Sequence, residues 1–199
     1  MALKIYGVAQ SRAIRVLWMA HELDIPFEHI PQDFAGEKSA EFLAVNPNGR
    51  VPAMDDDGFK LFESLAINTY LAKKYDKGLA PKGIKEDALV NQWSLWVMTE
   101  VEKPLLNAMF FTRGLMGNPK DPEKAAGYVA ELQKPFGVLN ASLAGKEYLL
   151  GNSFTVADLN VASVLSWAPG AKLDLSGFSN LNAWLTRCLS RPAMAKARG

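Results

Sequence analysis

Apolar and polar positions follow two different patterns over the first 75 residues. Residues 3–7 form a short apolar run typical of a buried strand. From Ser11 the apolar residues recur every three or four positions, which is typical of an amphipathic helix. The sequence Asp24-Ile25-Pro26 ends this helix. Residues 27–30 form a second strand. Since a helix separates the two strands, we expect a parallel, right-handed strand–helix–strand unit.

The pattern up to residue 75 completes an α/β unit. A short helix is predicted at 40–44, and two short strands at 53–55 and 60–62 flank the sequence Asp56-Asp57-Gly58, whose Asp-Gly pair suits a hairpin turn with positive φ. Ser64 then opens a helix that ends near residue 75. Alternating strands and helices favour an α/β domain over a helical bundle.

Strand patterns disappear after residue 76, and the rest of the chain predicts helices only. These helices span 86–113 with a kink at Pro104, 122–143, a short segment from Thr155, and 181–189. We therefore predict a fold of α/β plus all-α class. It has an α/β domain at 1–76, a linker at 77–84 and an all-helical domain at 85–199.

Composition and charge exclude several classes of protein. Lys and Arg exceed Asp and Glu by one, 22 against 21, so we expect no nucleic-acid or anionic-membrane partner. No signal region precedes the first strand, and no apolar run reaches the ~20 residues of a membrane span, so we expect a cytoplasmic protein. The single cysteine, Cys188, excludes an internal disulfide, and His21 and His29 stand without a Cys/His cluster, so we predict no metal site.

Four motifs, in this order of elements, resemble those of the cytosolic glutathione S-transferase family. They are SRAIRVLW at 11–18, NPNGRVP at 46–52, LFESLAI at 61–67 and SFTVADL at 153–159. The resemblance covers essentially the whole chain. The N-terminal half is most similar to the serine-type, phi- and theta-like, members of plants and bacteria. The resemblance implies a thioredoxin-like N-terminal domain followed by a C-terminal helical bundle.

Glu63-Ser64 stands where a strand passes into a helix. The unpaired N–H groups and the positive dipole end of that helix suit a carboxylate ligand. The alternative is a plain serine N-cap. In the family this pair binds the γ-glutamyl end of glutathione, the serine meeting its carboxylate and the glutamate its ammonium group.

The resemblance assigns the rest of glutathione to two loop segments. It implies a cis bond at Val51-Pro52, so that the backbone of Val51 pairs with the cysteinyl residue like an added strand; the alternative is an ordinary strand-edge proline. Lys38 and Arg50 lie where the family binds the glycine carboxylate. Serine-type relatives often carry glutamine at Arg50, and both cations have the alternative of being solvated surface charges.

Ser11 is the candidate for activating the thiol. A free thiol has a pKa of ~8.5, and lowering it by about two units requires roughly 2.7 kcal/mol of preference for the thiolate. A hydroxyl donor at a helix N-terminus can supply this, since a charge-assisted hydrogen bond is worth ~1.5–3 kcal/mol. Ser11 can also be a simple N-cap. The preceding loop is shorter than in close serine-type relatives, so Tyr6, which stands where tyrosine-type relatives carry their catalytic phenol, and Arg12 or a backbone group are alternative thiol donors.

Two further assignments concern the helical half. Thr155 with Asp158 forms a predicted capping box, and Phe154 can pack against Leu159, so loss of Asp158 should cost of order 1 kcal/mol or more in stability. Cys188 is expected in the core. The acceptor pocket is assigned to an apolar wall, although such residues are more often core. Its candidates are Tyr6, Arg12, Trp96, Met109, Phe110 and Arg113.

The resemblance implies a glutathione transferase that conjugates the glutathione thiolate to small apolar electrophiles in detoxification. It implies no metal or redox cofactor, and a homodimer. Two alternatives remain open. One is a non-catalytic module of the same fold for binding or assembly, and the other is a glutathione-dependent peroxidase or isomerase.

Overall fold

The computed structural model describes residues 3–199. The chain divides into two compact units, one of residues up to Ala80 together with Ser190–Gly199, the other of Pro81–Leu189. This corrects the assignment of residues 190–199 to the helical domain. A helix that the sequence analysis missed, α10 (Pro192–Arg198), packs there against α1 (Ala13–Glu22). Seven residues are too few to leave a readable helical period.

A four-stranded sheet forms the base of the first unit. Its strands are β1 (Leu3–Tyr6), β2 (Phe27–Ile30), β3 (Ala53–Asp56) and β4 (Phe59–Phe62), in the order β2-β1-β3-β4. β1 pairs with β2 in parallel, which confirms the predicted strand–helix–strand unit, and the other two pairings are antiparallel. In the β3–β4 turn, Asp57 and Gly58 have φ of 56° and 88°, the positive values expected of an Asp-Gly hairpin.

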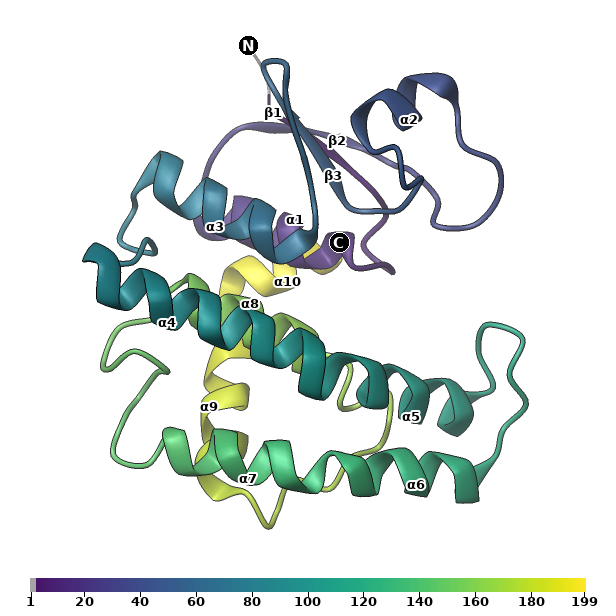
Figure 1. The fold of residues 1–199 in the computed structure, drawn as a ribbon, viewed down its shortest axis with the longest axis vertical. Helices are drawn as coiled ribbons and strands as arrows, with labels where there is room; N and C mark the ends of the chain where they lie inside the picture. The colour runs from purple at the N-terminus through teal and green to yellow at the C-terminus, as the bar shows by residue number, and fades with distance from the viewer. Residues whose placement is uncertain (1–2) are drawn as a thin grey trace. The chain divides into compact units, whose positions relative to one another are not determined.

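Three helices of this unit pack together. α1, α3 (Ser64–Tyr75) and α10 lie on one face of the sheet (Figure 1), and α1 contacts both of the others. Every residue from Ala13 to Ala20 of α1 is buried. The short α2 (Ala40–Val45) contacts β3 and β4 instead. α1 is therefore the central helix of the unit, and its first turn is fixed in position by the packing of the whole helix.

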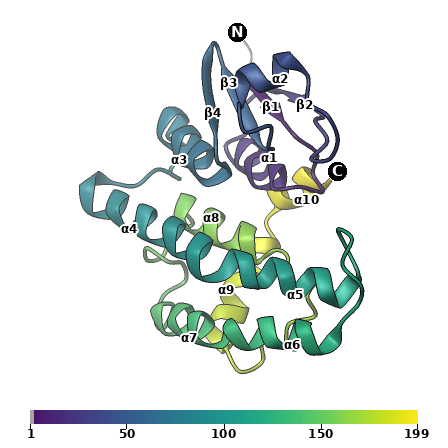
Figure 2. The same ribbon diagram turned by 45° about the vertical axis from the view of Figure 1, so that its right-hand side comes forward.

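The second unit is entirely helical within the described residues. Its helices are α4 (Gly83–Trp96), the π-helix η1 (Val97–Glu102), α5 (Lys103–Arg113), α6 (Pro122–Glu131), α7 (Gln133–Ser142), α8 (Val156–Leu165) and α9 (Ser179–Leu189). α8 is buried along its whole length, and α4 and α9 pack against it. α5 packs along α6, as Figures 1 and 2 both show. The fold is thus the predicted α/β plus all-α arrangement.

Two prolines account for where the helices depart from prediction. The long helix expected over 86–113 changes to the wider π-helical geometry in η1, just before Pro104, whose ring would collide with the carbonyl four residues back. The single helix expected over 122–143 is wrong. α6 ends at Glu131 and α7 begins at Gln133, since Pro135 has no N–H to donate to the Glu131 carbonyl.

The start of α8 confirms the predicted capping box. Asp158 accepts hydrogen bonds from the Thr155 N–H and hydroxyl (both 3.0 Å), and also from the Leu149 N–H (2.8 Å) and the Trp184 indole N–H (2.9 Å). Burial raises the pKa of Asp158, and these four donors oppose the rise. The carboxylate therefore joins α8, the preceding loop and α9 in the core.

Three observations bear on the classes considered from composition. Cys188 is buried on α9, as predicted. No helix within residues 3–199 has both the length and the apolar character that a membrane crossing requires. In the same stretch, no group of three or more His, Cys, Asp or Glu side chains is placed to hold a metal ion.

Candidate active site

The register of the sheet brings three of the four sequence motifs to one end of it. Tyr6, the last residue of β1, pairs with Ala53, the first residue of β3, which pairs in turn with Phe62, the last residue of β4. The segment leading to Ser11, the Val51–Pro52 pair and the Glu63–Ser64 pair each adjoin one residue of this row. Segments more than fifty positions apart in sequence are therefore neighbours in space.

Gly7 marks the closest approach among these segments. Its φ is +130°, and a Cβ there would lie 2.6 Å from the Cβ of Ala13 and 3.1 Å from that of Val51. Its N–H donates to the Ile30 carbonyl (3.0 Å), and the His29 Nε2 donates to the Gly7 carbonyl (2.6 Å). The start of α1 is thus held next to Val51. Neither Gly7 nor His29 was predicted as a site residue, although a glycine directly after a strand is a signal of close backbone approach.

Ser11 lies in the turn that leads into α1 and is half-buried. Its hydroxyl accepts from the Ala13 N–H (3.1 Å), which is a capping bond, and donates to the Val8 carbonyl (2.7 Å). The hydroxyl proton therefore rests on a neutral acceptor. A charge-assisted hydrogen bond is about twice as strong as a neutral one, so a thiolate within reach would compete well for this proton.

The two alternative thiol donors have different surroundings. Tyr6 is only 6% exposed, and burial, followed by the charges of Asp55, Glu41 and Glu28, raises the pKa of its phenol. A phenol with a raised pKa is a weaker partner for a thiolate, which weighs against Tyr6. Its ring belongs to an apolar cluster with Phe42, Val45, Val51 and Ala53. Arg12 is exposed at the N-cap of α1.

The Val51–Pro52 peptide bond is cis, as the resemblance implied. Among the hydrogen bonds of residues 3–199, none uses the N–H or the carbonyl of Val51, so both are available to an added strand. Asn46 fixes the preceding loop. Its buried side chain donates to the Arg50 carbonyl (2.6 Å) and accepts from the Asn48 N–H (3.1 Å). From the sequence, Asn46 was predicted only as part of a turn.

The two candidate cations for the glycine carboxylate lie on adjoining loops. The Lys38 ammonium donates to the Asp33 and Ala35 carbonyls (2.7 and 2.8 Å), which closes its own loop. The Lys38 chain also runs 3.4 Å from where a Cβ on Gly49 would stand. It therefore lies beside the segment that carries Arg50, whose side chain is exposed.

Glu63 and Ser64 form the start of α3. Glu63, the N-cap residue, is exposed and has φ of +72° and ψ of 109°, a conformation that side-chain-bearing residues rarely adopt. Its side chain makes no capping hydrogen bond to the helix. Ser64, the first helical residue, is buried. A helix N-terminus whose N-cap side chain makes no capping bond suits a carboxylate ligand.

Arg15 connects α1 to this helix end. Its side chain is fully buried, and its Nη1 donates to the Ser64 hydroxyl oxygen at 3.4 Å. Arg15 lies on α1, four residues beyond Ser11 in the turn that precedes the helix. Arg15 was not predicted from the sequence as a site residue. The signal was a charged residue within the apolar stripe of an amphipathic helix.

The acceptor-pocket candidates of the helical unit lie on α4 and α5. Trp96, Met109 and Phe110 are half-buried, and Arg113 is exposed. The Arg113 Nε donates to the Gly170 carbonyl (3.1 Å), and the Met109 sulfur would lie 2.8 Å from a Cβ on Gly170. Half-buried side chains suit a pocket wall as well as the edge of a core, so their assignment stays a prediction.

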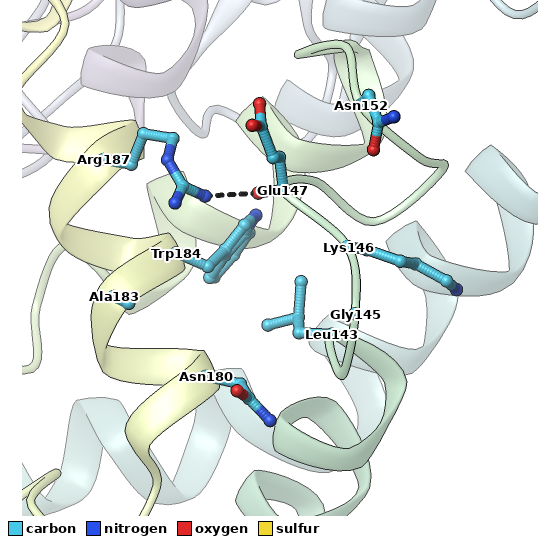
Figure 3. Close-up of a pocket in the computed structure, with 9 residues that line it drawn as sticks. All are labelled: Leu143, Gly145, Lys146, Glu147, Asn152, Asn180, Ala183, Trp184 and Arg187. Atoms are coloured by element: carbon cyan, nitrogen blue, oxygen red, sulfur yellow. Dashed lines mark hydrogen bonds between the residues drawn. The ribbon is translucent and has the colours of Figure 1, made fainter.

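A pocket of about 490 Å³ opens within the helical unit (Figure 3). Its lining residues are Leu143, Gly145, Lys146, Glu147, Asn152, Asn180, Ala183, Trp184 and Arg187. None of them is a residue that the sequence analysis assigned to glutathione or the acceptor. The guanidinium of Arg187 donates to the Glu147 carbonyl (2.6 Å), drawn as a dashed line in Figure 3. This pocket is therefore separate from the candidate active site.

Comparison with known proteins leads to one family. Residues 1–73 match the model of the glutathione S-transferase N-terminal domain, and residues 105–192 match that of the C-terminal domain. A glutathione S-transferase of Hyoscyamus muticus is 35% identical over 99% of this chain and 98% of its own length. The crystal structure of glutathione transferase F7 from Populus trichocarpa is 31% identical, covers 100% of both chains and gives a TM-score of 0.86.

A third relative carries a ligand. The structure of a glutathione S-transferase-I bound with lactoylglutathione is 29% identical to this chain. It covers 100% of this chain and 99% of its own, with a TM-score of 0.85. All three similarities extend over both units of the chain.

Proposed function

This chain belongs to the glutathione S-transferase family, and we propose that its first unit binds glutathione and activates the thiol at Ser11. It is an enzyme of the transferase class that uses glutathione as co-substrate. The observation that carries the proposal is the register of the sheet, which brings Ser11, Val51–Pro52 and Glu63–Ser64 to one end. These three segments offer a hydroxyl, an unpaired strand backbone and an anion-binding helix end.

Each part of glutathione has a matching group. The γ-glutamyl carboxylate binds at Ser64 and the first turn of α3, and the γ-glutamyl ammonium group binds Glu63. The cysteinyl backbone pairs with the N–H and carbonyl of Val51. The glycine carboxylate binds Lys38, with Arg50 as a second cation. The sulfur is then placed at the loop between β1 and α1, where Ser11 lies.

Activation consists of stabilising the thiolate. The thiol proton leaves to solvent, and the Ser11 hydroxyl turns from the Val8 carbonyl to donate to the sulfur anion. Its capping bond from the Ala13 N–H is retained, because a hydroxyl donates one hydrogen bond while accepting others. The positive dipole end of α1 adds a smaller stabilisation of the same sign.

The transfer step is a nucleophilic attack on an electrophilic carbon. The sulfur lone pair forms the new S–C bond. In a substitution the leaving group departs with the electrons of its bond, and in an addition the acceptor takes a proton from solvent. Proximity of the two bound reactants supplies the rest of the rate enhancement. The steps use glutathione, the acceptor, solvent and the chain's own residues.

Three finer points belong to the same proposal. The acceptor is a small apolar electrophile, the active species is a homodimer, and the enzyme works in the cytoplasm. All three are typical of the family that the comparisons identify. Size-exclusion chromatography with light scattering tests the dimer directly, and a panel of aryl halides and unsaturated carbonyl compounds tests the class of acceptor.

The decisive experiment is an ultraviolet difference titration of bound glutathione against pH. In the wild type we expect a thiolate pKa about two units below the free value of ~8.5. Ser11→Ala should return that pKa most of the way to the free value, because the hydroxyl donor is lost. Ser142→Ala removes a hydroxyl from α7 in the other unit and should leave the thiolate pKa unchanged.

Other outcomes would assign the role differently. A lowered pKa that survives Ser11→Ala but not Tyr6→Phe would transfer the role to Tyr6, despite its raised pKa. A wild type that binds glutathione without lowering its pKa would favour a ligand carrier, and one that binds no glutathione would refute the proposal.

A further inference from the structure

The side chain of His29 contacts the loop that leads to Ser11. Its Nε2 lies 2.6 Å from the carbonyl oxygen of Gly7, the residue that follows β1. A carbonyl oxygen can only accept a hydrogen bond, so the imidazole N–H is the donor. His29 is on β2, which is an edge strand of the sheet. The bond therefore joins the edge of the sheet to the first residue of the loop between β1 and α1.

The pairing of the two strands does not account for this bond. The paired residues of β1 and β2 end at Tyr6 and Ile30, and the Gly7 N–H already donates to the Ile30 carbonyl (3.0 Å). Within residues 3–199, no backbone N–H donates to the Gly7 carbonyl. The His29 ring therefore supplies a donor that a longer β2 would supply from its own backbone.

The backbone at Gly7 has little conformational restriction of its own. Its φ is +130°, and a residue without a Cβ rotates more freely than any other. The Gly7 carbonyl and the Val8 N–H belong to one planar peptide unit. A donor held on β2 therefore fixes the orientation of the plane through which the chain enters the loop.

Val8 connects this peptide plane to the candidate hydroxyl. Its carbonyl accepts from the Ser11 N–H (3.0 Å) and from the Ser11 hydroxyl (2.7 Å). The same hydroxyl accepts from the Ala13 N–H (3.1 Å) at the start of α1. A tilt of the plane between Gly7 and Val8 would move the Val8 carbonyl, and the Ser11 oxygen would move with it.

We propose that His29 is a positioning residue for Ser11. By fixing the Gly7 carbonyl, it holds the Ser11 oxygen where the hydroxyl can donate to the glutathione sulfur in good geometry. The inference rests on the proposed function, because it presumes that Ser11 stabilises the thiolate. His29 does not contact glutathione in this scheme, so its loss should raise the thiolate pKa and leave affinity for the tripeptide unchanged.

Two replacements of His29 test the proposal in the ultraviolet difference titration of bound glutathione. His29→Gln places an amide N–H near the position of the imidazole Nε2, whereas the amide of His29→Asn is one bond shorter and does not reach the Gly7 carbonyl. Neither replacement titrates, so the pair separates the donor from the charge. His29→Gln should keep the wild-type thiolate pKa, and His29→Asn should raise it by about one unit.

Two controls separate positioning from packing. The affinity for S-methylglutathione, which has no thiol, should be the same in the wild type and in both variants. His21→Gln replaces the other histidine of the chain, whose ring packs against Phe27, and should leave the thiolate pKa unchanged. Thermal unfolding shows whether each variant is folded, and His29→Ala takes the place of His29→Asn if the latter does not fold.

A double variant shows whether His29 acts through Ser11. Ser11→Ala combined with His29→Asn should have the thiolate pKa of Ser11→Ala alone, because the second change then has no hydroxyl to misplace. Effects that add would overturn the positioning role. So would an equal thiolate pKa in His29→Gln and His29→Asn, or a loss of affinity for S-methylglutathione in His29→Asn.

Failure of the proposed function gives a different result. A wild-type protein that does not lower the thiol pKa, or one in which Ser11→Ala leaves it lowered, would refute the role of Ser11 itself. A thiolate pKa that rises in Ser11→Ala but stays at the wild-type value in His29→Asn would refute only the role of His29.

Discussion

The N-termini of α3 and α8 differ in how their first turns are capped. At α8, Thr155 and Asp158 exchange the two bonds of a capping box, and further donors fill the remaining capacity of the carboxylate. At α3 the side chain of the N-cap residue, Glu63, makes no capping bond, and this residue is exposed with a positive φ. The N-terminus of α8 is therefore capped by buried side chains, whereas the N-cap side chain of α3 is exposed and makes no capping bond.

The difference teaches how a helix start can serve either the fold or a ligand. Unpaired N–H groups at a helix end need a partner, and an internal carboxylate that supplies it adds to stability. An end without such a partner gives up that stability and keeps its binding capacity for an external anion. Changes at α8 should therefore affect unfolding, and changes at α3 should affect affinity for glutathione.

The largest effect should follow Asp158→Asn. The amide keeps one acceptor oxygen, so its NH₂ group must face two of the buried donors from Leu149, Thr155 and Trp184. Leaving buried donors unpaired costs ~1–3 kcal/mol each, so we expect a loss of about 3 kcal/mol or more in the free energy of unfolding. Urea denaturation of the wild type and the variant measures it.

If the start of α8 serves only the fold, Asp158→Asn should reduce stability and leave glutathione binding unchanged. The variant that remains folded should bind glutathione with the wild-type thiolate pKa. Asp174→Asn, at an exposed carboxylate, should cost less than about 0.5 kcal/mol. A loss below about 1 kcal/mol in Asp158→Asn would show that the four hydrogen bonds do not carry the stability assigned to them.

The second-largest effect should follow Glu63→Gly, which should raise stability and weaken glutathione binding. A residue with a side chain costs ~1–3 kcal/mol in such a backbone conformation, so Glu63→Gly should stabilise the protein by about 1 kcal/mol. The same change removes the carboxylate proposed to bind the γ-glutamyl ammonium group. The KM for glutathione should therefore rise about tenfold with little change in kcat.

Asp57→Gly is the matched control for Glu63→Gly. Asp57 also has a positive φ, 56°, but it lies in the β3–β4 hairpin turn. Its replacement should change stability slightly and leave the KM for glutathione as it is. If both variants raise KM equally, or if Glu63→Gly lowers stability without changing KM, then α3 is an ordinary helix start and the contrast with α8 fails.

The sequence allowed most of this contrast to be predicted, because its signals are local. A Ser or Thr before a helix, an acid three residues later and an Asn-Pro-Asn-Gly turn before a proline each follow from neighbouring residues. The capping box of Asp158 was found in this way, whereas the cis bond at Val51–Pro52 was expected only from the family resemblance. Their spatial grouping followed only from the family resemblance, since strand register is a long-range property.

The residues that were missed act over long range or in short elements. Arg15 is an arginine within the apolar stripe of a helix, and its contact with Ser64, 49 positions away, could not be predicted from neighbouring residues. The side chain of His29 on β2 contacts the backbone of Gly7, which follows the neighbouring strand β1. The helix α10 is too short to show a helical period. Pro135 was included in the helix predicted over 122–143, although a proline has no N–H to donate to the carbonyl four residues back.

The smallest effect should come from the other end of α3. Asp56 on β3 accepts a hydrogen bond from the Tyr70 hydroxyl (2.7 Å) and pairs with the Lys74 ammonium, both on α3. Burial alone would raise the pKa of Asp56, but the bonds from Lys74 and Tyr70 outweigh it and hold the pKa below its usual range. These contacts fix α3 to the sheet without involving its open start.

Asp56→Asn should therefore cost stability without changing affinity for glutathione. Lys74 is more than a third exposed, so the cost should be only about 1 kcal/mol near neutral pH. Because the folded pKa is lowered, this contribution is present above the unfolded pKa of ~3.9 and is lost as pH falls through the folded value. Urea unfolding of both proteins between pH 7 and pH 3 should show the gap closing on the acid side. A gap that stays constant, or a raised KM for glutathione, would mean that the two ends of α3 are not independent.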